Sequence, residues 1–417
     1  MIRNTPVPYQ VWGKEIEKDA LEQMRRAALL PVSIKGALMP DAHPGYGLPI
    51  GGVLAVENAV IPYAVGVDIA CRMKMTVFNV SPHVLEQKRG KIREILEAST
   101  RFGTGGTWDQ RHDHPVMSDS TWKEIPIVRA NKDTAWQQLG TSGSGNHFVE
   151  FGELIVTTPI TGEDSEQGEG SRAFGKIPPG NYLAVLSHSG SRHLGAAIAE
   201  HYTQLAMQSH PDLASEYKHL SWLDMNGYGA EYWAAMNLAG RYASANHAII
   251  HRLLADKLRF EVLGGVENHH NFAWKEQVDG QELIVHRKGA TPAGENVYGV
   301  IPGSMTAPGF VVLGKGKPES INSASHGAGR RMSRKAALNT FSWDQVEHKL
   351  KNAGVELVSA DLDEAPGAYK DIHEVMEAQQ DLVQPVAEFR PRLVKMAPGK
   401  NPHKRDKNSR LKRKRDR

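Results

Sequence analysis

The residues of this chain that are best suited to chemistry are one aspartate and the single cysteine, Asp68 and Cys71, which stand three positions apart. Asp68 falls at the end of the apolar run 61–69, where a carboxylate is costly unless another group pairs with it. A thiolate and a carboxylate in one short turn can form half of a metal site, and imidazole is a suitable complement. Since the chain has 19 histidines, we expect some of them to complete a divalent-metal site.

Three histidines stand beside glycine, serine or asparagine where a predicted strand begins or ends: His147, His188 and His270. A side chain at such a place can turn into a cleft, and Cys, His and Asp ligands together suit Zn²⁺ or Mn²⁺. The sequence has no paired-spacing motif such as CxxC followed by HxxxH. Taken singly, each histidine is better explained as a hydrogen-bonded loop residue, and Cys71 as a small buried hydrophobic side chain. Only the recurrence of the pattern favours a metal site.

A second group of residues could bind phosphate. The glycine-rich segments 140–145 and 327–329, together with Ser304, offer backbone N–H groups and hydroxyls to anions, although neither segment is a Walker A motif. His326 precedes the second segment at a predicted helix N-terminus, with no acidic residue nearby in sequence. A neutral imidazole there could attack phosphorus. The alternative, a turn in which His326 has no chemical role, is favoured by the residues alone.

Hydrophobic periodicity predicts the elements that carry these loops. The predicted helices are 15–30, 82–98, one beginning near 194, and 229–258; Pro126 is expected to divide 119–138 into two short helices. The predicted strands are 32–39, 53–56, 74–80, 182–186, 260–266, 283–287 and 393–395. The polar segment 157–180 is expected to be an exposed loop. Because the special loops are scattered along the chain, we expect one interwoven α/β domain over residues 1–397.

The composition is that of a soluble globular protein, with 40% hydrophobic and 23% charged residues. No apolar run approaches the roughly 20 residues that span a bilayer, and the N-terminus lacks the apolar core of a signal peptide. One cysteine cannot form an internal disulfide, so a reducing cytoplasm is the expected compartment.

The charge is concentrated at the C-terminus. Residues 400–417 hold ten Lys or Arg residues against two Asp residues, a net charge of +8, so the other 399 residues carry −5 of the total of +3. We therefore expect residues 398–417 to be a basic, disordered tail that contacts polyanions such as RNA. A solubilising terminus without a specific partner explains the tail equally well.

Several unusual strings together resemble the RtcB family of 3′-phosphate RNA ligases, and the resemblance covers nearly the whole body of the chain. The strings occur in one order, which makes chance similarity a poor explanation. They are Met39-Pro40-Asp41, Gly66-Val67-Asp68-Ile69 with Cys71, Gly145-Asn146-His147-Phe148, His188-Ser189-Gly190-Ser191-Arg192, His269-His270-Asn271, Arg287-Lys288-Gly289-Ala290, Pro302-Gly303-Ser304-Met305, Ser325-His326-Gly327-Ala328-Gly329-Arg330, Ala368-Tyr369-Lys370-Asp371 and Val394-Lys395.

The resemblance implies a single large domain of interwoven mixed β-sheets and helices around a central metal cleft, with two Mn²⁺ ions and GTP. It implies that the metal ligands are Asp68, Cys71, His147, His188 and His270, with the Cys71 thiolate bridging both ions. His326 would take GMP covalently. The residues that would hold the guanylate are Asn146, Glu150, Ser304, Ala328, Gly329, Tyr369 and Lys395, with Glu150 and Lys395 reading the base.

The implied reaction joins an RNA 3′-phosphate or 2′,3′-cyclic phosphate to a 5′-hydroxyl through histidine-GMP and RNA-3′-pp-5′-G intermediates. The chain departs from the family pattern where glycine is usual, at Ala70, Arg72 and His193, and in its extension beyond Lys395. These departures indicate a divergent paralogue whose substrate is a damaged ribosomal or transfer RNA. Two other classes stay open: a metal-dependent phosphodiesterase of RNA ends, and an RNA-binding repair factor without catalysis.

Overall fold

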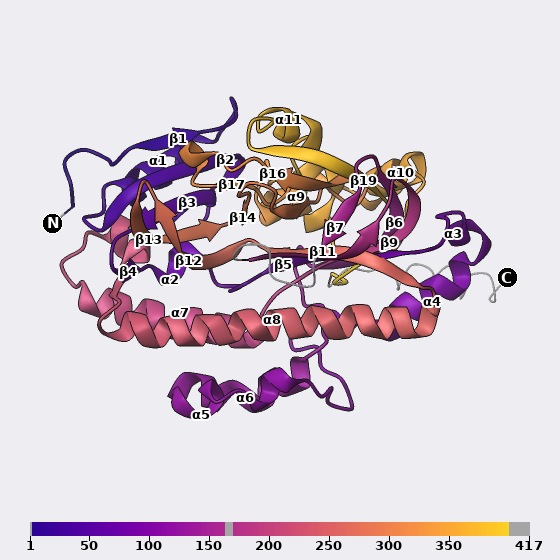
Figure 1. Cartoon of the computed structure of the whole chain (residues 1–417), viewed down its shortest axis with the longest axis horizontal. Helices are drawn as coiled ribbons and strands as arrows, with labels where there is room; N and C mark the ends of the chain where they lie inside the picture. Colours follow the sequence, from indigo (N-terminus) through magenta and orange to yellow (C-terminus); the bar gives the residue numbers. More distant parts are fainter. Residues whose placement is uncertain (1, 163–169, 400–417) are drawn as a thin grey trace.

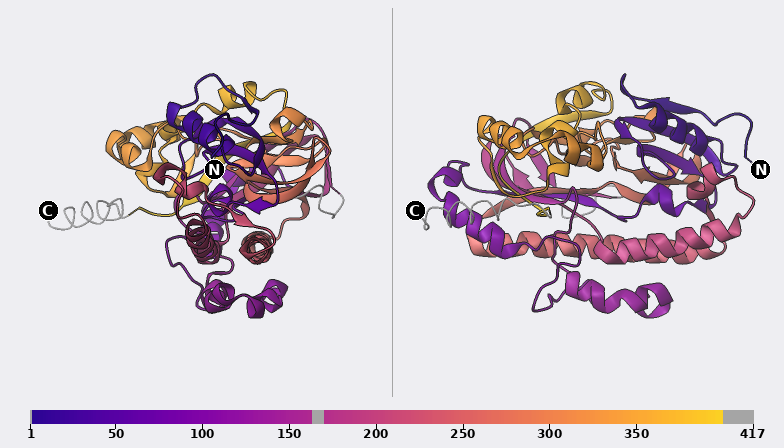
Figure 2. Two further views of the ribbon diagram at one scale, coloured as in Figure 1. Left: turned by 90° about the vertical axis from the view of Figure 1, so that its left-hand side faces the viewer. Right: turned by 180° about the vertical axis from the view of Figure 1, so that it is seen from behind.

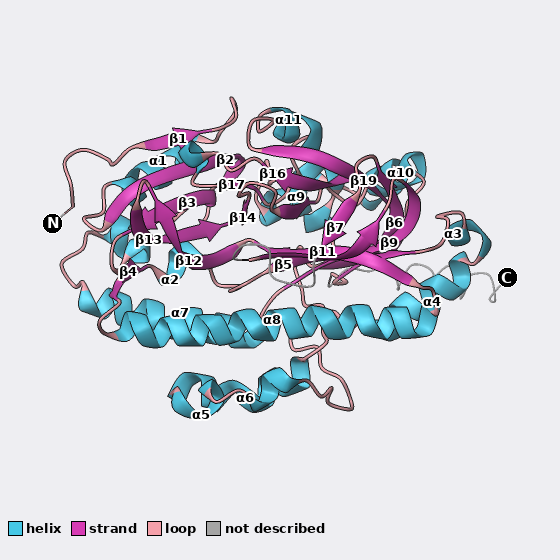
Figure 3. Ribbon diagram, viewed as in Figure 1, coloured by secondary structure: helices cyan, strands magenta, loops and turns pink. Residues whose placement is uncertain are grey.

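The computed structural model describes residues 2–162 and 170–399. Its largest element is a ten-stranded mixed sheet in the order β15-β16-β19-β6-β9-β5-β11-β8-β7, with β18 parallel to β19 (Figures 1 and 3). The strands are β5 (Arg72–Phe78), β6 (Phe148–Val156), β7 (Ile160–Gly162), β8 (Ser171–Ile177), β9 (Gly180–Ser189), β11 (Val262–His269), β15 (Tyr298–Ile301), β16 (Gly309–Gly314), β18 (Glu356–Ser359) and β19 (Val383–Met396).

A second sheet has five strands in the order β1-β2-β3-β13-β12, of which only β1 and β2 are parallel. Two short antiparallel pairs, β4 with β10 and β14 with β17, lie outside both sheets. The bounds are β1 (Tyr9–Val11), β2 (Ser33–His43), β3 (Ile50–Val56), β4 (Ala59–Val60), β10 (Leu223–Asp224), β12 (Asn271–Val278), β13 (Gln281–Lys288), β14 (Ala290–Pro292) and β17 (Ser323–Ser325).

Two long helices, α7 (Arg192–Ser209) and α8 (Tyr228–Leu258), lie side by side beneath the sheets, and α6 (Pro126–Gln138) packs against α7 (Figure 2). The alanine-rich sequence of α8 allows this close packing, and most of one side of α8 is buried. In the described part of the chain, no helix combines the length and apolarity needed to cross a membrane. The remaining helices are α1 (Lys18–Ala28), α2 (Pro62–Val65), α3 (Val84–Gln87), α4 (Arg89–Ser99), α5 (Thr121–Glu124), α9 (Arg334–Thr340), α10 (Trp343–Ala353) and α11 (Ile372–Glu377).

Strand alternation gives the large sheet two different faces at its centre. On β9, Ser187 and His188 point to opposite sides because successive side chains of a strand alternate. His188 pairs with Met73 of β5 and with Phe148 of β6, and all three side chains line one cavity. The opposite face, which carries Ser187, packs against α8. The sheet thus separates a cavity face from a helix-covered face.

The structure confirms the expected α/β architecture of interwoven mixed sheets, and Pro126 begins α6 directly after α5, as predicted. Two expectations are wrong. The segment 157–180 contains β7 and β8, although its composition is polar. The strand β8 pairs with β11, and its side chains at Ser171, Ala173 and Ile177 are buried. Residues 163–169 lie outside the described part. His326 is not at a helix N-terminus either, since it follows β17 and the next helix starts only after its cap, Ser333. Of the predicted tail, only Pro398 and Gly399 belong to the described residues.

Candidate active site

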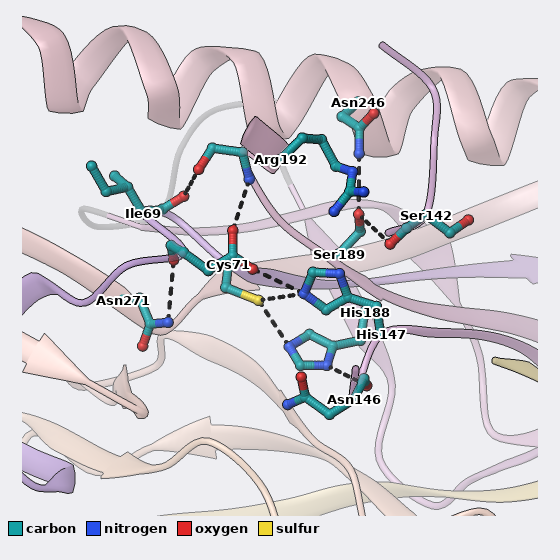
Figure 4. Close-up of polar contacts among 12 residues, drawn as sticks. Ile69, Cys71, Ser142, Asn146, His147, His188, Ser189, Arg192, Asn246 and Asn271 are labelled. Atoms are coloured by element: carbon teal, nitrogen blue, oxygen red, sulfur yellow. Dashed lines mark hydrogen bonds and ion pairs between the residues drawn. The ribbon is translucent and has the colours of Figure 1, made fainter. Parts of the chain in front are cut away.

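The predicted metal ligands converge at the central strands of the large sheet, and Figure 4 shows Cys71, His147 and His188 of this set. The Sγ atom of Cys71 lies 3.0 Å from Nε2 of His188 and 3.4 Å from Nε2 of His147. Nε2 of His147 is 2.9 Å from Oδ2 of Asp68, and Nε2 of His188 is 3.2 Å from Nε2 of His270. The ligand atoms of Cys71, His147 and His188 all lie within 4.8 Å of one another, so one ion could contact all three.

The donor set of this cluster fits a divalent cation. Burial holds the pKa values of His188 and His270 well below the ordinary value, so both imidazoles are neutral and can ligate. Nδ1 of His188 donates to the Asn146 carbonyl at 3.1 Å, which leaves Nε2 as the acceptor that points into the cluster. Nδ1 of His147 and of His270 is buried without a hydrogen-bond partner in the described residues. The Nε2 atoms of the three histidines, by contrast, face one another, the Cys71 thiol or the Asp68 carboxylate, and are the atoms that a cation could bind.

The Asp68 carboxylate and the Cys71 thiol differ in their ionisation. Burial raises the pKa of Asp68, but the hydrogen bond and the charge of His147 outweigh it and hold the pKa at about 2. Burial, reinforced by the charge of Asp68, raises the pKa of Cys71 well above its usual value. Cys71 is thus a thiol in the absence of a cation, and ligation would require the loss of its proton.

Backbone contacts fix the turn that carries these two ligands. The N–H of Ser191 donates to Oδ1 of Asp68 at 3.2 Å, and Nδ2 of Asn271 donates to the Asp68 carbonyl at 3.2 Å. A Cβ atom on Gly190 would lie only 2.2 Å from Oδ1 of Asp68, so only glycine allows the β9–α7 connection to pass the carboxylate. Ala70 adopts φ 55°, a left-handed conformation that explains why glycine is usual there.

The candidate nucleophile His326 adjoins this cluster, with its ring centroid 4.9 Å from that of His270. Its Nδ1 lies 2.7 Å from Oδ2 of Asp41, and its backbone N–H donates to the same oxygen at 3.2 Å. A proton on Nδ1 leaves the lone pair on Nε2. Asp41 is fully buried, and its Oδ1 has no partner in the described residues. Sequence reasoning missed Asp41, although a carboxylate inside the apolar stretch 37–42 was a signal of the same kind as Asp68.

A cavity of about 620 Å³ opens beside His326 and gathers most of the residues expected to hold a guanylate. These residues are Asn146, Glu150, Ser304, Ala328, Gly329 and Tyr369. Burial raises the pKa of Glu150 to about 8, and no other group contributes to this shift. A Cβ atom on Gly329, where φ is +71°, would meet the Asp41 carbonyl at 2.1 Å, so glycine is required there. The cavity thus brings a buried, uncompensated carboxyl group close to the candidate nucleophile.

Lys395 is the one expected guanylate residue that does not line this cavity. Lys395 of β19 pairs with Val149 of β6, and its neighbours Val394 and Met396 line the cavity. Because side chains alternate along a strand, Lys395 lies on the opposite face of the sheet from the cavity. Its Nζ donates to Oγ1 of Thr100 at 2.8 Å and lies 5.6 Å from the Phe102 ring centroid.

A second cavity, of about 600 Å³, reaches the cluster from another side. Asp68, His147 and Arg192 line it, and Asn146 lines both cavities. Residues 397–399, which precede the basic segment 400–417 in the sequence, form part of its wall.

The unusual residues Arg72 and His193 do not project toward the metal ligands. Nη1 of Arg72 contacts Oε1 of Glu267, and its Nη2 donates to the Gly240 carbonyl of α8 at 3.0 Å. The Arg72 charge is therefore neutralised on the helix-covered face of the sheet. His193 is exposed near the start of α7, and its backbone N–H donates to Gln138 at 3.1 Å.

Comparisons with known proteins agree with this geometry. The family model "tRNA-splicing ligase RtcB" matches residues 23–128 and 116–396. The chain is 32% identical to the RNA-splicing ligase RtcB of Escherichia coli (strain K12), over 93% of this chain and 96% of that protein. It is 31% identical to the tRNA-splicing ligase RtcB of Nanoarchaeum equitans, over 94% and 95% of the two chains. For the protein of the same name from Thermococcus kodakarensis, the identity is 29% over 92% and 94%. The chain therefore belongs to the RtcB family.

Proposed function

We propose that this protein is a GTP-dependent RNA ligase that joins an RNA 3′-phosphate or 2′,3′-cyclic phosphate to a 5′-hydroxyl. The observation that carries the proposal is the position of His326. It is held by the buried Asp41 carboxylate, it lies against the metal-ligand cluster, and it lines the cavity that contains Glu150. An oriented imidazole beside a cation site and a nucleotide-sized cavity is suited to nucleotidyl transfer.

The metal ligands in this proposal are Asp68, Cys71, His147, His188 and His270, and the expected occupant is a pair of Mn²⁺ ions. Bound there, divalent cations would neutralise the negative charge of the reacting phosphates. A set that contains a thiolate and three imidazoles differs from the all-oxygen coordination that Mg²⁺ prefers.

In the first step, His326 acts as the nucleophile toward GTP. Its Nε2 lone pair forms a bond to the α-phosphorus, and the bond to the departing pyrophosphate breaks. Asp41 keeps the proton on Nδ1, so Nε2 enters the reaction with a free lone pair. As positive charge develops on the imidazole, the carboxylate of Asp41 stabilises it. Glu150 would accept hydrogen bonds from the guanine base.

The later steps use the RNA ends. An oxygen of the RNA 3′-phosphate attacks the phosphorus held on His326, the P–N bond breaks, and the RNA-3′-pp-5′-G end forms. The 5′-hydroxyl of the second end then attacks the 3′-phosphorus, which forms the phosphodiester and releases GMP and a proton. A 2′,3′-cyclic phosphate must first be opened by water. The two cavities that share Asn146 support this scheme, because the guanylate and RNA can approach the cluster from different sides.

The two alternative functions receive no specific support. The phosphodiesterase alternative depended on Arg72 disturbing the transfer to His326, but its guanidinium is paired with Glu267 on the other face of the sheet. A silent RNA-binding protein would have no need of a buried carboxylate that orients His326.

The partner is RNA, and we propose a damaged ribosomal or transfer RNA as the target. The net charge of +8 on residues 400–417, which follow directly after the cavity residue Gly399 in the sequence, supports a role of this segment in RNA affinity. A ligand set that needs a free thiol fits the reducing cytoplasm. Equal ligation of unrelated broken RNAs, with and without residues 398–417, would refute a specific target.

The decisive experiment is incubation of the purified protein with Mn²⁺ and α-labelled GTP, followed by denaturing electrophoresis. We expect an acid-labile covalent label on the wild type and on His83→Ala, which alters an exposed histidine remote from the cavity, but none on His326→Ala. Addition of RNA with 3′-phosphate and 5′-hydroxyl ends should then discharge the label and yield joined RNA. Absence of a label on a wild type that binds Mn²⁺ would refute the proposal.

A further inference from the structure

Three aromatic rings meet at the rim of the His326 cavity, although they come from distant parts of the sequence. Tyr46 belongs to the β2–β3 connection, Tyr63 to α2, and His219 to the 3-10 helix Ser215–Leu220. The ring centroids of Tyr63 and His219 are 4.9 Å apart, and that of Tyr46 lies 5.6 Å from His219 and 6.4 Å from Tyr63. We call these three residues the aromatic platform.

The platform exposes an aromatic ring to solvent at the entrance of a cavity. Tyr46 is 68% exposed, the largest value among the exposed large hydrophobic residues of the described chain, and it also lines the cavity that contains His326. Its neighbours in space, Tyr63 and His219, are half-buried and support it from below. An exposed ring that rests on two others has a free face for a planar ligand.

The position of Tyr46 is fixed by its surroundings. Gly47 has φ +71°, and a Cβ atom there would lie 2.5 Å from the His219 carbonyl oxygen, so the two segments touch at the backbone. The N–H of Gly45 donates to Oε1 of Gln23 at 3.0 Å. Nζ of Lys288 donates to the Tyr46 carbonyl and lies 5.9 Å from the Tyr63 ring centroid. The backbone that carries the ring is therefore held by contacts to three other segments.

An unpaired nucleobase is the ligand that matches this surface. Base–aromatic stacking is the usual way in which proteins bind single-stranded RNA. A protein partner would require a contiguous apolar patch, yet the exposed neighbours of His219 are the charged residues Glu216 and Lys218. We propose that the aromatic platform stacks one unpaired base of the RNA whose end enters the His326 cavity. The inference rests on the proposed function, because it takes RNA as the substrate.

The test measures RNA binding directly. Single-stranded RNAs with a 3′-phosphate carry the fluorescent base 2-aminopurine at successive positions from the reacting end, and each is titrated with the full chain and Mn²⁺ in the absence of GTP. For one position we expect quenching by the wild type that Tyr46→Ala abolishes. Because it cannot stack this base, the Tyr46→Ala variant should bind the RNA with an affinity about tenfold lower than that of the wild type.

Two variants serve as controls. Tyr46→Phe retains the ring and should bind RNA within about twofold of the wild type. Tyr228→Ala removes another exposed tyrosine, 56% exposed and outside the lining of both cavities, and should likewise bind normally. An RNA that is abasic at the quenched position should bind the wild type and Tyr46→Ala equally.

The inference is overturned if Tyr46→Ala binds all these RNAs as the wild type does, or if Tyr46→Phe loses as much affinity as Tyr46→Ala. Either result would leave the proposed ligase function intact, provided that the wild type still joins RNA ends. Failure of ligation by the wild type would instead refute the proposed function, and quenching that depends on Tyr46 would still support the platform.

Discussion

A cluster of buried histidines lies against each face of β9, and the two clusters differ in the hydrogen-bond partners of their ring nitrogens. On the face covered by α8, Ser187 contacts Nδ1 of His247 at 2.8 Å and Nε2 of His251 at 2.7 Å. The remaining nitrogens contact Thr76 Oγ1 at 2.8 Å and the Ser189 carbonyl at 3.1 Å. Every ring nitrogen of His247 and His251 therefore has a hydroxyl or carbonyl partner.

On the cavity face, the Nε2 atoms of His147, His188 and His270 point at one another, at a thiol or at a carboxylate, and the Nδ1 atoms of His147 and His270 have no partner in the described residues. Two buried glutamates show the same contrast. On the helix-covered face, Lys74 and Arg72 outweigh burial and hold the pKa of Glu267 well below its usual value, whereas burial alone raises that of Glu150. The ligand cluster and Glu150 thus hold buried groups that the fold leaves uncompensated, which is typical of functional sites.

The sharpest test of this contrast replaces one histidine on each face. His188→Ala should lower the affinity for Mn²⁺ by more than about 100-fold, because it removes a ligand rather than a group that merely supports one. His251→Ala should leave Mn²⁺ binding unchanged and instead lower the free energy of unfolding by about 2–4 kcal/mol, through a cavity and unpaired hydroxyls. Calorimetric titration with Mn²⁺ and urea unfolding measure the two effects.

Equal losses of Mn²⁺ affinity in the two variants, measured under conditions where both are folded, would contradict the assignment of the two faces. His251→Gln keeps a polar side chain near Ser187 and should recover part of the lost stability, which separates loss of hydrogen bonding from loss of the fold.

The second largest effect is expected at Asp41, which acts through His326. Asp41→Asn should slow the transfer of GMP to His326 by on the order of 10²-fold, because the amide no longer fixes the proton on Nδ1 or stabilises a charged imidazole. Single-turnover labelling at varied GTP concentration should show a lower rate at saturation with unchanged apparent affinity for GTP. A role confined to folding would instead lower the thermal midpoint without this selective loss.

Much of this arrangement was accessible from the sequence. Strand-to-loop transitions placed His147 and His188 correctly at the ends of buried strands, and the apolar periodicity of 229–258 gave α8. The pairing of Asp41 with His326 was not accessible, because 285 positions separate the two residues and only the fold brings them together. Which face of the sheet Lys395 occupies depends on the pairing register of β19 with β6. A short apolar segment does not define that register. The segment 157–180 was mistaken for a loop because its composition is polar, although β8 gains its stability by pairing with β11.

The third prediction uses pH to test the uncompensated glutamate. With a pKa of about 8, raised from 4.5, the Glu150 carboxyl is neutral at pH 6–7 and must lose its proton before both of its oxygens can accept hydrogen bonds from guanine. Guanosine binding should therefore strengthen as pH rises from 6 to 8, by up to about tenfold per pH unit, and then level off above the pKa. Titrations across this range measure the slope, and Glu150→Gln should flatten it. A flat profile for the wild type would show that Glu150 does not ionise on binding the base.

The smallest expected effect concerns the turn that carries Asp68 and Cys71. Ala70→Gly relieves a left-handed backbone at φ 55° but loses a buried methyl group and adds freedom to the unfolded chain, so these terms nearly cancel. We expect the free energy of unfolding in urea to change by less than about 0.5 kcal/mol. The same substitution at Ala130, exposed within α6, has no strain to relieve and should cost about 1 kcal/mol. An equal cost at both positions would mean that the Asp68–Cys71 turn does not hold Ala70 in the left-handed conformation, and the positions of both ligands would then need revision.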